Sequence, residues 1–173
     1  MDFDLTDRVA IVTGGSQGLG EACVHALAQA GAHVAVVARE PEGVTRGRDR
    51  PHAAVAPVVD QVLALGRRAI GITADVREND QVERMVEQVM REFDRIDILV
   101  NVVGGSWGET FKAGPIEEVT AHDLLETYRV NVVTMFQCST AVAPIMKRQG
   151  KGSIINIASI AGVSPSPASP GYG

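Results

Sequence analysis

The stretch Thr13-Gly-Gly-Ser-Gln-Gly-Leu-Gly20 joins an apolar run at 9–13 to an amphipathic run at 18–30. The first run, VAIVT, is typical of a buried strand, and the second carries apolar side chains at helical spacing. Gly14, Gly18 and Gly20 allow positive φ and a close approach of the backbone to a ligand. The first turn of a helix offers unpaired N–H groups to a phosphate. The stretch therefore predicts a dinucleotide-binding turn, with an ordinary strand-to-helix turn as the alternative.

The rest of the chain repeats this alternation of strand and helix. The expected strands are 34–38, 69–74, 97–101 and 153–158, and the expected helices are 53–65, 80–93 and 121–148. Asp80 with Glu83, and Thr120 with Asp123, are candidate capping boxes of the last two helices. Strands that are apolar on both faces are typical of a parallel sheet covered by helices. We therefore expect an α/β fold with a doubly wound parallel sheet, in a single domain over 1–173, with loops at 40–52 and 163–173.

Composition excludes several classes of protein. The chain has 173 residues, with 16 Lys and Arg against 21 Asp and Glu, and a net charge of -5. This balance provides no basic face for nucleic acid, and no apolar run approaches the length of a membrane span. The acidic N-terminal sequence MDFDLTDR lacks the pattern of a signal peptide. Cys23, Cys138 and the four histidines show no metal-ligand spacing. We expect a cytoplasmic protein with reduced thiols and no metal.

The order of these motifs resembles the short-chain dehydrogenase/reductase family. The family's glycine-rich cofactor turn matches this chain at Gly14, Ser16, Gln17, Gly18, Leu19 and Gly20. Its Asp-Val pair after the third strand, which contacts the adenine ring, matches Asp75 and Val76. Its N-N-A-G segment after the fourth strand reads Asn101-Val-Val-Gly104 here, so the two middle positions differ. The resemblance implies a Rossmann-like sheet of order 3-2-1-4-5 whose cofactor site is built from these residues.

The resemblance also implies three catalytic residues. Asn131 in RVNVV matches the Asn of the family's long helix, Ser159 follows the fifth strand, and Tyr172 stands thirteen residues after Ser159. In the family, the Tyr is the general acid or base, the Ser hydrogen-bonds the substrate oxygen, and the Asn anchors a proton relay. The implied reaction is hydride transfer between a nicotinamide and a carbonyl or alcohol carbon of a small molecule. For each residue taken singly, a purely structural role is the alternative.

The residue after the second strand bears on the choice of cofactor. An acidic residue there binds the ribose 2′-hydroxyl of NAD, whereas this chain has Arg39 after Ala38. A guanidinium pairs well with a 2′-phosphate. We therefore expect NADP, with NAD as the second choice. The alternative is that Arg39 is a surface charge paired with Glu40.

The family pattern continues beyond the catalytic Tyr with a Lys four residues later, whereas this sequence stops at Gly173. We therefore expect the C-terminal part of the family fold to be missing from this sequence. The apolar strand 153–158, interior in the family, would then be an exposed edge. Family members are usually homo-oligomers, so the complete protein is expected to be a dimer or tetramer. A non-catalytic nucleotide-binding or regulatory domain is the alternative function.

Overall fold

A computed structural model describes residues 4–39, 54–106, 111–164 and 171–172. Five parallel strands form one sheet in the order β3-β2-β1-β4-β5, which confirms the expected order. The strands are β1 (Val9–Thr13), β2 (His33–Ala38), β3 (Ala69–Thr73), β4 (Ile98–Asn101) and β5 (Ser153–Asn156). The α-helices are α1 (Gly18–Gln29), α2 (Ala56–Ala64), α3 (Asn79–Phe93), α4 (Ala121–Tyr128) and α5 (Thr134–Gln149). The expected loop 40–52 lies outside the described residues.

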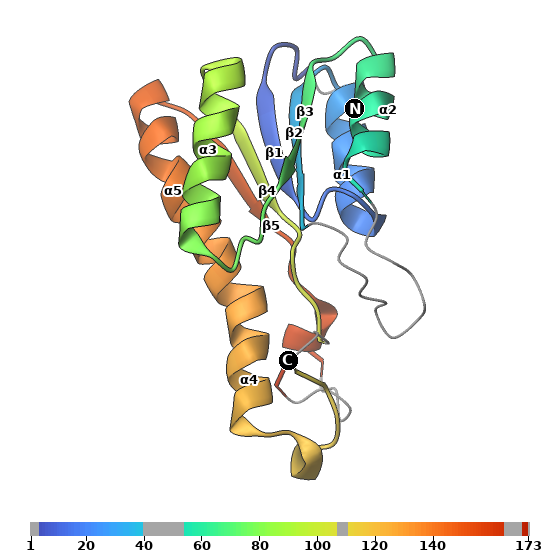
Figure 1. The fold of residues 1–173 in the computed structure, drawn as a ribbon, viewed down its shortest axis with the longest axis vertical. Coiled ribbons are helices and arrows are strands. Elements are labelled where there is room, and N and C mark those ends of the chain that lie inside the picture. The colour runs from blue at the N-terminus through green and yellow to red at the C-terminus, as the bar shows by residue number, and fades with distance from the viewer. Residues whose placement is uncertain (1–3, 40–53, 107–110, 165–170, 173) are drawn as a thin grey trace.

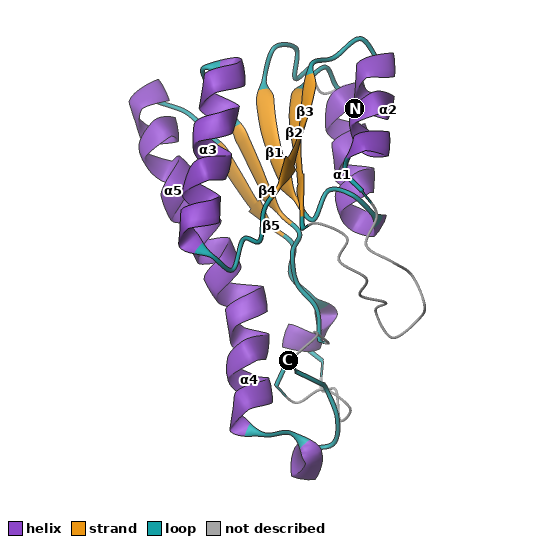
Figure 2. Ribbon diagram, viewed as in Figure 1, coloured by secondary structure: helices purple, strands orange, loops and turns teal. Residues whose placement is uncertain are grey.

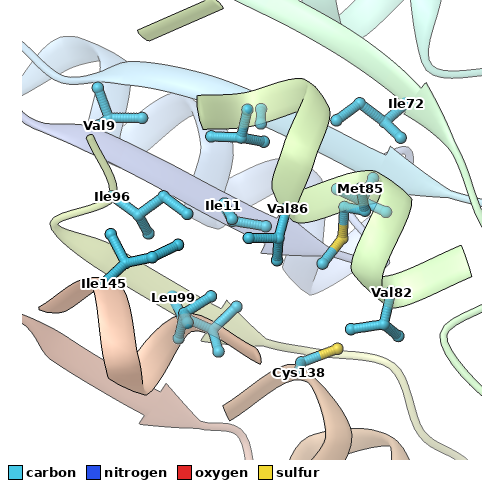
Figure 3. Packing of buried hydrophobic residues seen from close by; sticks show 14 of the residues in the cluster. Val9, Ile11, Ile72, Val82, Met85, Val86, Ile96, Leu99, Cys138 and Ile145 are labelled. Atoms are coloured by element: carbon cyan, nitrogen blue, oxygen red, sulfur yellow. The ribbon is translucent and has the colours of Figure 1, made fainter. Parts of the chain in front are cut away.

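The sheet lies between two helical layers (Figures 1 and 2): α1 and α2 cover one face, and α3 and α5 cover the other. Successive residues of a strand point to opposite faces, so Ile11 belongs to the core under α3 and α5 while Val12 belongs to the core under α1 and α2. Figure 3 shows Ile11, Met85 and Leu99 packed together in the first of these cores. Both faces of β1, β2 and β4 are therefore buried, as the apolar strands predict.

The helix expected over 121–148 is interrupted. The helices α4 and α5 are joined by η2 (Arg129–Val133), a π-helical turn that contains Asn131. A π-turn inserts one extra residue into a helix and is frequent at functional sites. On either side of this turn, α4 projects beyond the carboxyl ends of the strands and α5 lies against the sheet (Figure 1).

The two predicted capping boxes have different outcomes. At α4, the Thr120 side chain accepts from the Asp123 backbone N–H and the Asp123 carboxylate accepts from the Thr120 N–H, which confirms that box. At α3, the N-cap is Glu78, and its side chain makes no capping hydrogen bond. The predicted box of Asp80 and Glu83 is therefore wrong. The helix begins one residue earlier than the predicted start, and Asp80 instead pairs with Arg84.

Strand β5 forms one edge of the sheet and is short, ending at Asn156 rather than at 158. Its residues are exposed, and Ile155 has 44% of its surface accessible. Ile154 and Ile157 are also exposed. An apolar edge strand with unpaired backbone groups is a template for pairing with further polypeptide.

Candidate functional site

The glycine-rich turn between β1 and α1 has the backbone geometry that the sequence predicts. Gly14 and Gly18 adopt φ of 69° and 58°, in the left-handed region that favours glycine. A Cβ added to Gly20 would meet the Gly14 carbonyl oxygen at 2.0 Å, so only glycine lets the helix start pack on the turn. A Cβ added to Gly18 would meet no atom within 4 Å among the described residues. The turn is therefore tight on the protein side and open on the outer side.

The start of α1 is suited to an anion. Gln17 is the N-cap, with extended backbone, and its side chain makes no capping hydrogen bond. Gln17 therefore provides no side-chain acceptor for the first N–H groups of α1, and these groups add to the positive end of the helix dipole. Ser16 is buried beneath the turn, and Leu19 is exposed on its outer side. These residues fit the pyrophosphate of a dinucleotide cofactor.

The ends of β2 and β3 lie side by side, because Ala38 pairs in register with Thr73. Arg39 follows β2 and is half-buried. Asp75 and Val76 follow β3, and Val76 is buried. Burial raises the pKa of the Asp75 carboxyl, but hydrogen bonds from Arg77 and the charges of Arg77 and Arg39 outweigh burial, so this pKa lies below its ordinary value. The charges of Arg77 and Arg39 thus both favour the ionised form of Asp75.

Asn101 ends β4 and connects three elements. Its Nδ2 donates to Asn156 Oδ1 of β5 at 2.9 Å and lies 3.4 Å from Ser139 Oγ of α5. The residue is 2% exposed, and its Oδ1 is buried without a hydrogen-bond partner among the described residues. Just beyond β4, the Val102 N–H donates to Thr13 Oγ1 of β1 at 3.2 Å. The Asn101 side chain therefore links the end of β4 to β5 and α5, and the neighbouring Val102 N–H links it to β1.

Asn131 holds the segment that follows β4. Its Oδ1 accepts from the Gly105 N–H, and its Nδ2 donates to the carbonyls of Gly105 and Thr127, each at 2.8 Å. A Cβ on Gly104 would lie 2.6 Å from Asn131 Oδ1, so glycine is needed for this close approach. From the π-turn, the side chain of Asn131 thus links the backbone of α4, at Thr127, to the segment after β4, at Gly105.

Ser159 and Tyr172 lie beyond β5. Ser159 is exposed, and its Oγ accepts from the Ala161 N–H at 3.2 Å, which caps the 3₁₀ turn η3 (Ile160–Gly162). Tyr172 is half-buried in a turn. Its neighbour Gly171 lies against Leu124, in a hollow that is also lined by Ile116 and Val119. No hydrogen bond joins Ser159 to Tyr172 among the described residues.

The described residues contain no group of three or more His, Cys, Asp or Glu side chains that could hold a metal ion. Among these residues, no helix has the length and apolar character that crossing a membrane would require. Cys23 and Cys138 are both free thiols, and burial raises the pKa of Cys138 to about 12. A thiol with so high a pKa is not a nucleophile at neutral pH.

Sequence reasoning missed two side chains of this site. Asn156 accepts a hydrogen bond from Asn101, and Arg77 donates to both oxygens of the Asp75 carboxylate. The position of Asn156 at the end of an apolar strand, in register with Asn101, is a signal that would have found it. The spacing of Asp75 and Arg77 gives no comparable signal.

Known proteins share this arrangement. An uncharacterized oxidoreductase of Mycobacterium tuberculosis is 34% identical over 161 residues, which cover 92% of this chain and 55% of that protein. A 3-oxoacyl-[acyl-carrier-protein] reductase of Synechocystis is 33% identical, over 97% of this chain and 62% of that protein. The solved structure of a 7α-hydroxysteroid dehydrogenase with NADH and 7-oxo glycochenodeoxycholic acid has a TM-score of 0.84 and 26% identity, over 99% of this chain and 60% of that chain.

The chain spans 55–62% of the length of these relatives. The sequence model of the short chain dehydrogenase family matches residues 8–173, almost the whole of this chain. The sheet order is the one that the resemblance implies. The chain belongs to the short-chain dehydrogenase family.

Proposed function

We propose that this chain is the cofactor-binding and catalytic part of an NADP(H)-dependent oxidoreductase acting on a carbonyl or alcohol group of a small molecule. One observation supports the proposal. The strands are parallel, and the residues at or after their carboxyl ends are the glycine turn, Arg39, Asn101 and Ser159. Ligands of open α/β sheets bind at this edge. The relatives support a carbonyl substrate, since one is named a 3-oxoacyl reductase and another was solved with a 7-oxo steroid.

Three side chains would carry the reaction. A bound nicotinamide supplies or accepts the hydride. Tyr172 gives a proton to the substrate oxygen in reduction and takes it back in oxidation. Ser159 donates a hydrogen bond to that oxygen as negative charge develops on it. Asn131 acts through the backbone that it holds, because its amide is already bonded to Gly105 and Thr127.

Arg39 supports NADP as the cofactor, with NAD as the second choice. It stands directly after β2, where the family places the residue that faces the ribose, and its charge acts on Asp75. A guanidinium in this place is complementary to a 2′-phosphate in charge and in geometry. NAD remains the competing cofactor, because two neighbouring structures hold it, one as NAD+ and one as NADH.

The test of cofactor choice is the substitution Arg39→Ala, titrated with NADPH and NADH by nicotinamide fluorescence in the full-length protein. We expect NADPH binding to weaken by about 1–3 kcal/mol, the range for a hydrogen bond to a charged group, while NADH binding stays nearly unchanged. Arg148→Ala, an exposed arginine in the last turn of α5, is the matched control. An equal loss for both cofactors would contradict the assignment of Arg39 to the 2′-phosphate.

We further propose a cytoplasmic homo-oligomer. Leu125, Tyr128, Val132 and Phe136 are exposed and stand three or four residues apart along α4, η2 and the start of α5. The four side chains therefore form a row of exposed apolar residues along this helical segment. An exposed apolar stripe of this kind is typical of a protein interface, and a second copy of the chain would cover it in a symmetric pair.

A further inference from the structure

Asn101 holds the carboxyl end of β5 in two ways. Its carbonyl accepts from the Ile157 N–H at 3.0 Å, and its side-chain Nδ2 donates to Asn156 Oδ1 at 2.9 Å. Among the described residues, these are the last hydrogen bonds between β4 and the chain that leads to Ser159. Asn101 therefore bonds two consecutive residues at the end of β5, one through its main chain and the other through its side chain.

The amide group of Asn101 is oriented by a second neighbour. The Ser139 hydroxyl of α5 donates to the Met135 carbonyl at 2.6 Å, so Ser139 Oγ can only accept a further bond. The Asn101 Nδ2 lies 3.4 Å from that oxygen. The Nδ2 group therefore has two acceptors, Ser139 Oγ and Asn156 Oδ1. Because Asn101 is buried, leaving one of its N–H groups without an acceptor is costly, and this cost favours a fixed place for the Asn156 side chain.

The two bonds from Asn101 restrain β5 in different directions. The bond from the Ile157 N–H to the Asn101 carbonyl continues the ladder and runs between the strands, in the plane of the sheet. The side chains of Asn101 and Asn156, which are paired in register, extend from the face of the sheet that α5 covers. A strand that is bonded only in the sheet plane can still rotate about its own axis, whereas a bond outside the plane resists this rotation. The Asn156 side chain therefore fixes the orientation of the end of β5.

Ser159 stands three residues after Asn156. Its backbone is extended, with φ of -128° and ψ of 149°, and its Oγ accepts from the Ala161 N–H at 3.2 Å. Because the oxygen accepts this bond, the hydroxyl hydrogen is left to be donated to a substrate. The Ala161 bond orients the hydroxyl within its own turn, η3, and the connection from this turn to the sheet runs through Ile157 and Asn156. The orientation of the end of β5 therefore decides where the Ser159 hydroxyl lies.

We propose that Asn156 is a positioning residue of the reaction: through its side-chain bond to Asn101, it sets the place of the Ser159 hydroxyl relative to the substrate oxygen. The inference rests on the proposed function. Asn156 acts through Ser159 and not on the substrate itself. A displacement of about 1 Å at a reacting group can lower a rate on the order of 10²-fold, so a small rotation of the end of β5 is enough to affect the rate.

The test is a double-mutant cycle in the full-length protein. Asn156→Leu removes the acceptor at similar side-chain volume, and Asn156→Asp keeps an oxygen that accepts from Asn101 Nδ2. Each is made in the natural protein and in Ser159→Ala, and Ser153→Ala at the other end of β5 is the control. The kcat and the KM for NADPH are measured with two carbonyl probes, a 3-oxoacyl thioester and a 7-oxo steroid, the carbonyl types that the names of two relatives include.

We expect Asn156→Leu to lower kcat about 10-fold, the scale of one lost hydrogen bond, with the KM for NADPH within about 2-fold of the natural value. Asn156→Asp should keep kcat within about 3-fold, because a carboxylate oxygen accepts at least as well as an amide oxygen. In Ser159→Ala, the change Asn156→Leu should lower kcat less than about 2-fold, because the hydroxyl that it positions is already absent. Ser153→Ala should stay within about 2-fold of the natural protein, as expected for a surface change.

Three results would overturn the inference. Natural kcat in Asn156→Leu would mean that the bond does not position Ser159. An equal loss in the presence and absence of the Ser159 hydroxyl would mean that Asn156 acts elsewhere. An equal loss in Asn156→Asp and Asn156→Leu would mean that the acceptor is not what matters. A natural protein that reduces neither probe would instead overturn the proposed function, and the inference with it. Thermal melts check folding, and Asn156→Ala replaces Asn156→Leu in the cycle if the leucine variant is unfolded.

Discussion

Gly20 is the glycine of the cofactor turn at which an added methyl group would clash most severely. A Cβ there would lie 2.0 Å from the Gly14 carbonyl oxygen, which is backbone and cannot rotate away. We expect Gly20→Ala to destabilise the chain by about 1–3 kcal/mol, the usual cost of overpacking, and to weaken dinucleotide binding because the turn must open. Thermal melts and cofactor titration measure the two effects.

Gly162→Ala is the matched control, because a Cβ on Gly162 meets nothing within 4 Å among the described residues and its φ is not positive. Gly18→Ala separates strain from clash. Its Cβ also meets nothing, but its φ of 58° costs an alanine about 1 kcal/mol. Equal effects of Gly20→Ala and Gly162→Ala would show that the close approach of Gly20 to Gly14 is unimportant.

Tyr172 and Ser159 are the residues on which the proposed reaction depends. In the full-length protein, Tyr172→Phe should lower kcat by about 10²–10⁴-fold, as for loss of a general acid. Ser159→Ala should lower kcat about 10²-fold, as for loss of one donor to a developing oxyanion. The two losses should not add, because the groups act as a unit. Steady-state reduction of a carbonyl substrate with NADPH measures them.

Cofactor affinity is the internal control for both variants. Neither the phenol nor the hydroxyl touches the adenosine half of the cofactor in the proposed site, so NADPH should bind within a few-fold of the natural protein. Near-full activity of Tyr172→Phe would remove Tyr172 from the mechanism. It would then favour a nucleotide-binding domain without catalysis.

At the residue scale, a feature of this site could be predicted from the sequence when it depends on one residue or its close neighbours, and not when it depends on residues far apart in the chain. The positive φ of Gly14 and Gly18 could be predicted because glycine itself is the signal. The bonds of Asn131 could not be, because they join residues 26 positions apart. The Asp75–Arg77 pair is local, but an Asp and an Arg two residues apart occur in many turns without pairing.

At the scale of elements, the start of α4 is controlled by the Thr120–Asp123 capping box. Hydrogen bonds from the Thr120 side chain, the Thr120 N–H and the Lys112 N–H lower the pKa of Asp123 to about 2. The ordinary Asp pKa in an unfolded chain is about 3.9. Because the pKa of Asp123 is lower in the folded state than in the unfolded chain, its ionisation stabilises the fold at pH values above about 4. That contribution disappears as the pH falls from about 4 toward 2.

We therefore expect Asp123→Asn to lower the melting temperature at pH 7 by roughly 2–4 °C, the scale of one lost cap in a domain of this size. The difference from the natural protein should shrink as the pH falls from 4 to 2, because both then lack the carboxylate charge. Asp60→Asn, on the exposed side of α2, should melt like the natural protein at every pH. A pH-independent effect of Asp123→Asn would mean that the charge contributes nothing.

Elements whose ends are fixed by local hydrogen bonds could be predicted, and the π-turn could not. Thr120 and Asp123 are three residues apart, the spacing that a capping box requires. The helical periodicity of 121–148 continues through Arg129–Val133 without a visible break. The break accompanies the bond from Asn131 Nδ2 to the Thr127 carbonyl, and Asn131 is also held by Gly105 from outside the helix. Tertiary contact, not sequence period, thus marks the interruption.

At the scale of the whole molecule, the parallel sheet could be predicted from the alternation of strand and helix, and its order from the family resemblance. Which apolar surfaces are exposed could not be predicted in this way. The residues of β5 read as a buried strand and are exposed in this structure. The helical stripe of Leu125, Tyr128, Val132 and Phe136 reads as part of an ordinary amphipathic helix, yet it faces away from both cores. Sequence periodicity predicts an apolar face without specifying whether the chain itself or a partner buries it.

The stripe provides the last prediction, which concerns assembly. Leu125 and Phe136 are each 67% exposed, and with Tyr128 and Val132 they form an apolar patch rather than scattered residues. If a second copy covers them, Phe136→Glu would bury an unpaired carboxylate at the interface and should raise the dissociation constant of the oligomer at least about 100-fold. Sedimentation velocity of the full-length protein over a range of concentrations measures this constant.

Leu63→Glu on α2 places the same charge on another exposed leucine, which has 49% of its surface accessible, and lies outside the stripe. This control variant should sediment like the natural protein, which excludes a general effect of added charge. Leu125→Glu, at the other end of the stripe, should dissociate the oligomer as Phe136→Glu does, because both remove apolar area from one continuous face. An oligomer that withstands both stripe variants would mean that its copies meet elsewhere, and the exposed edge of β5 is then the next surface to test.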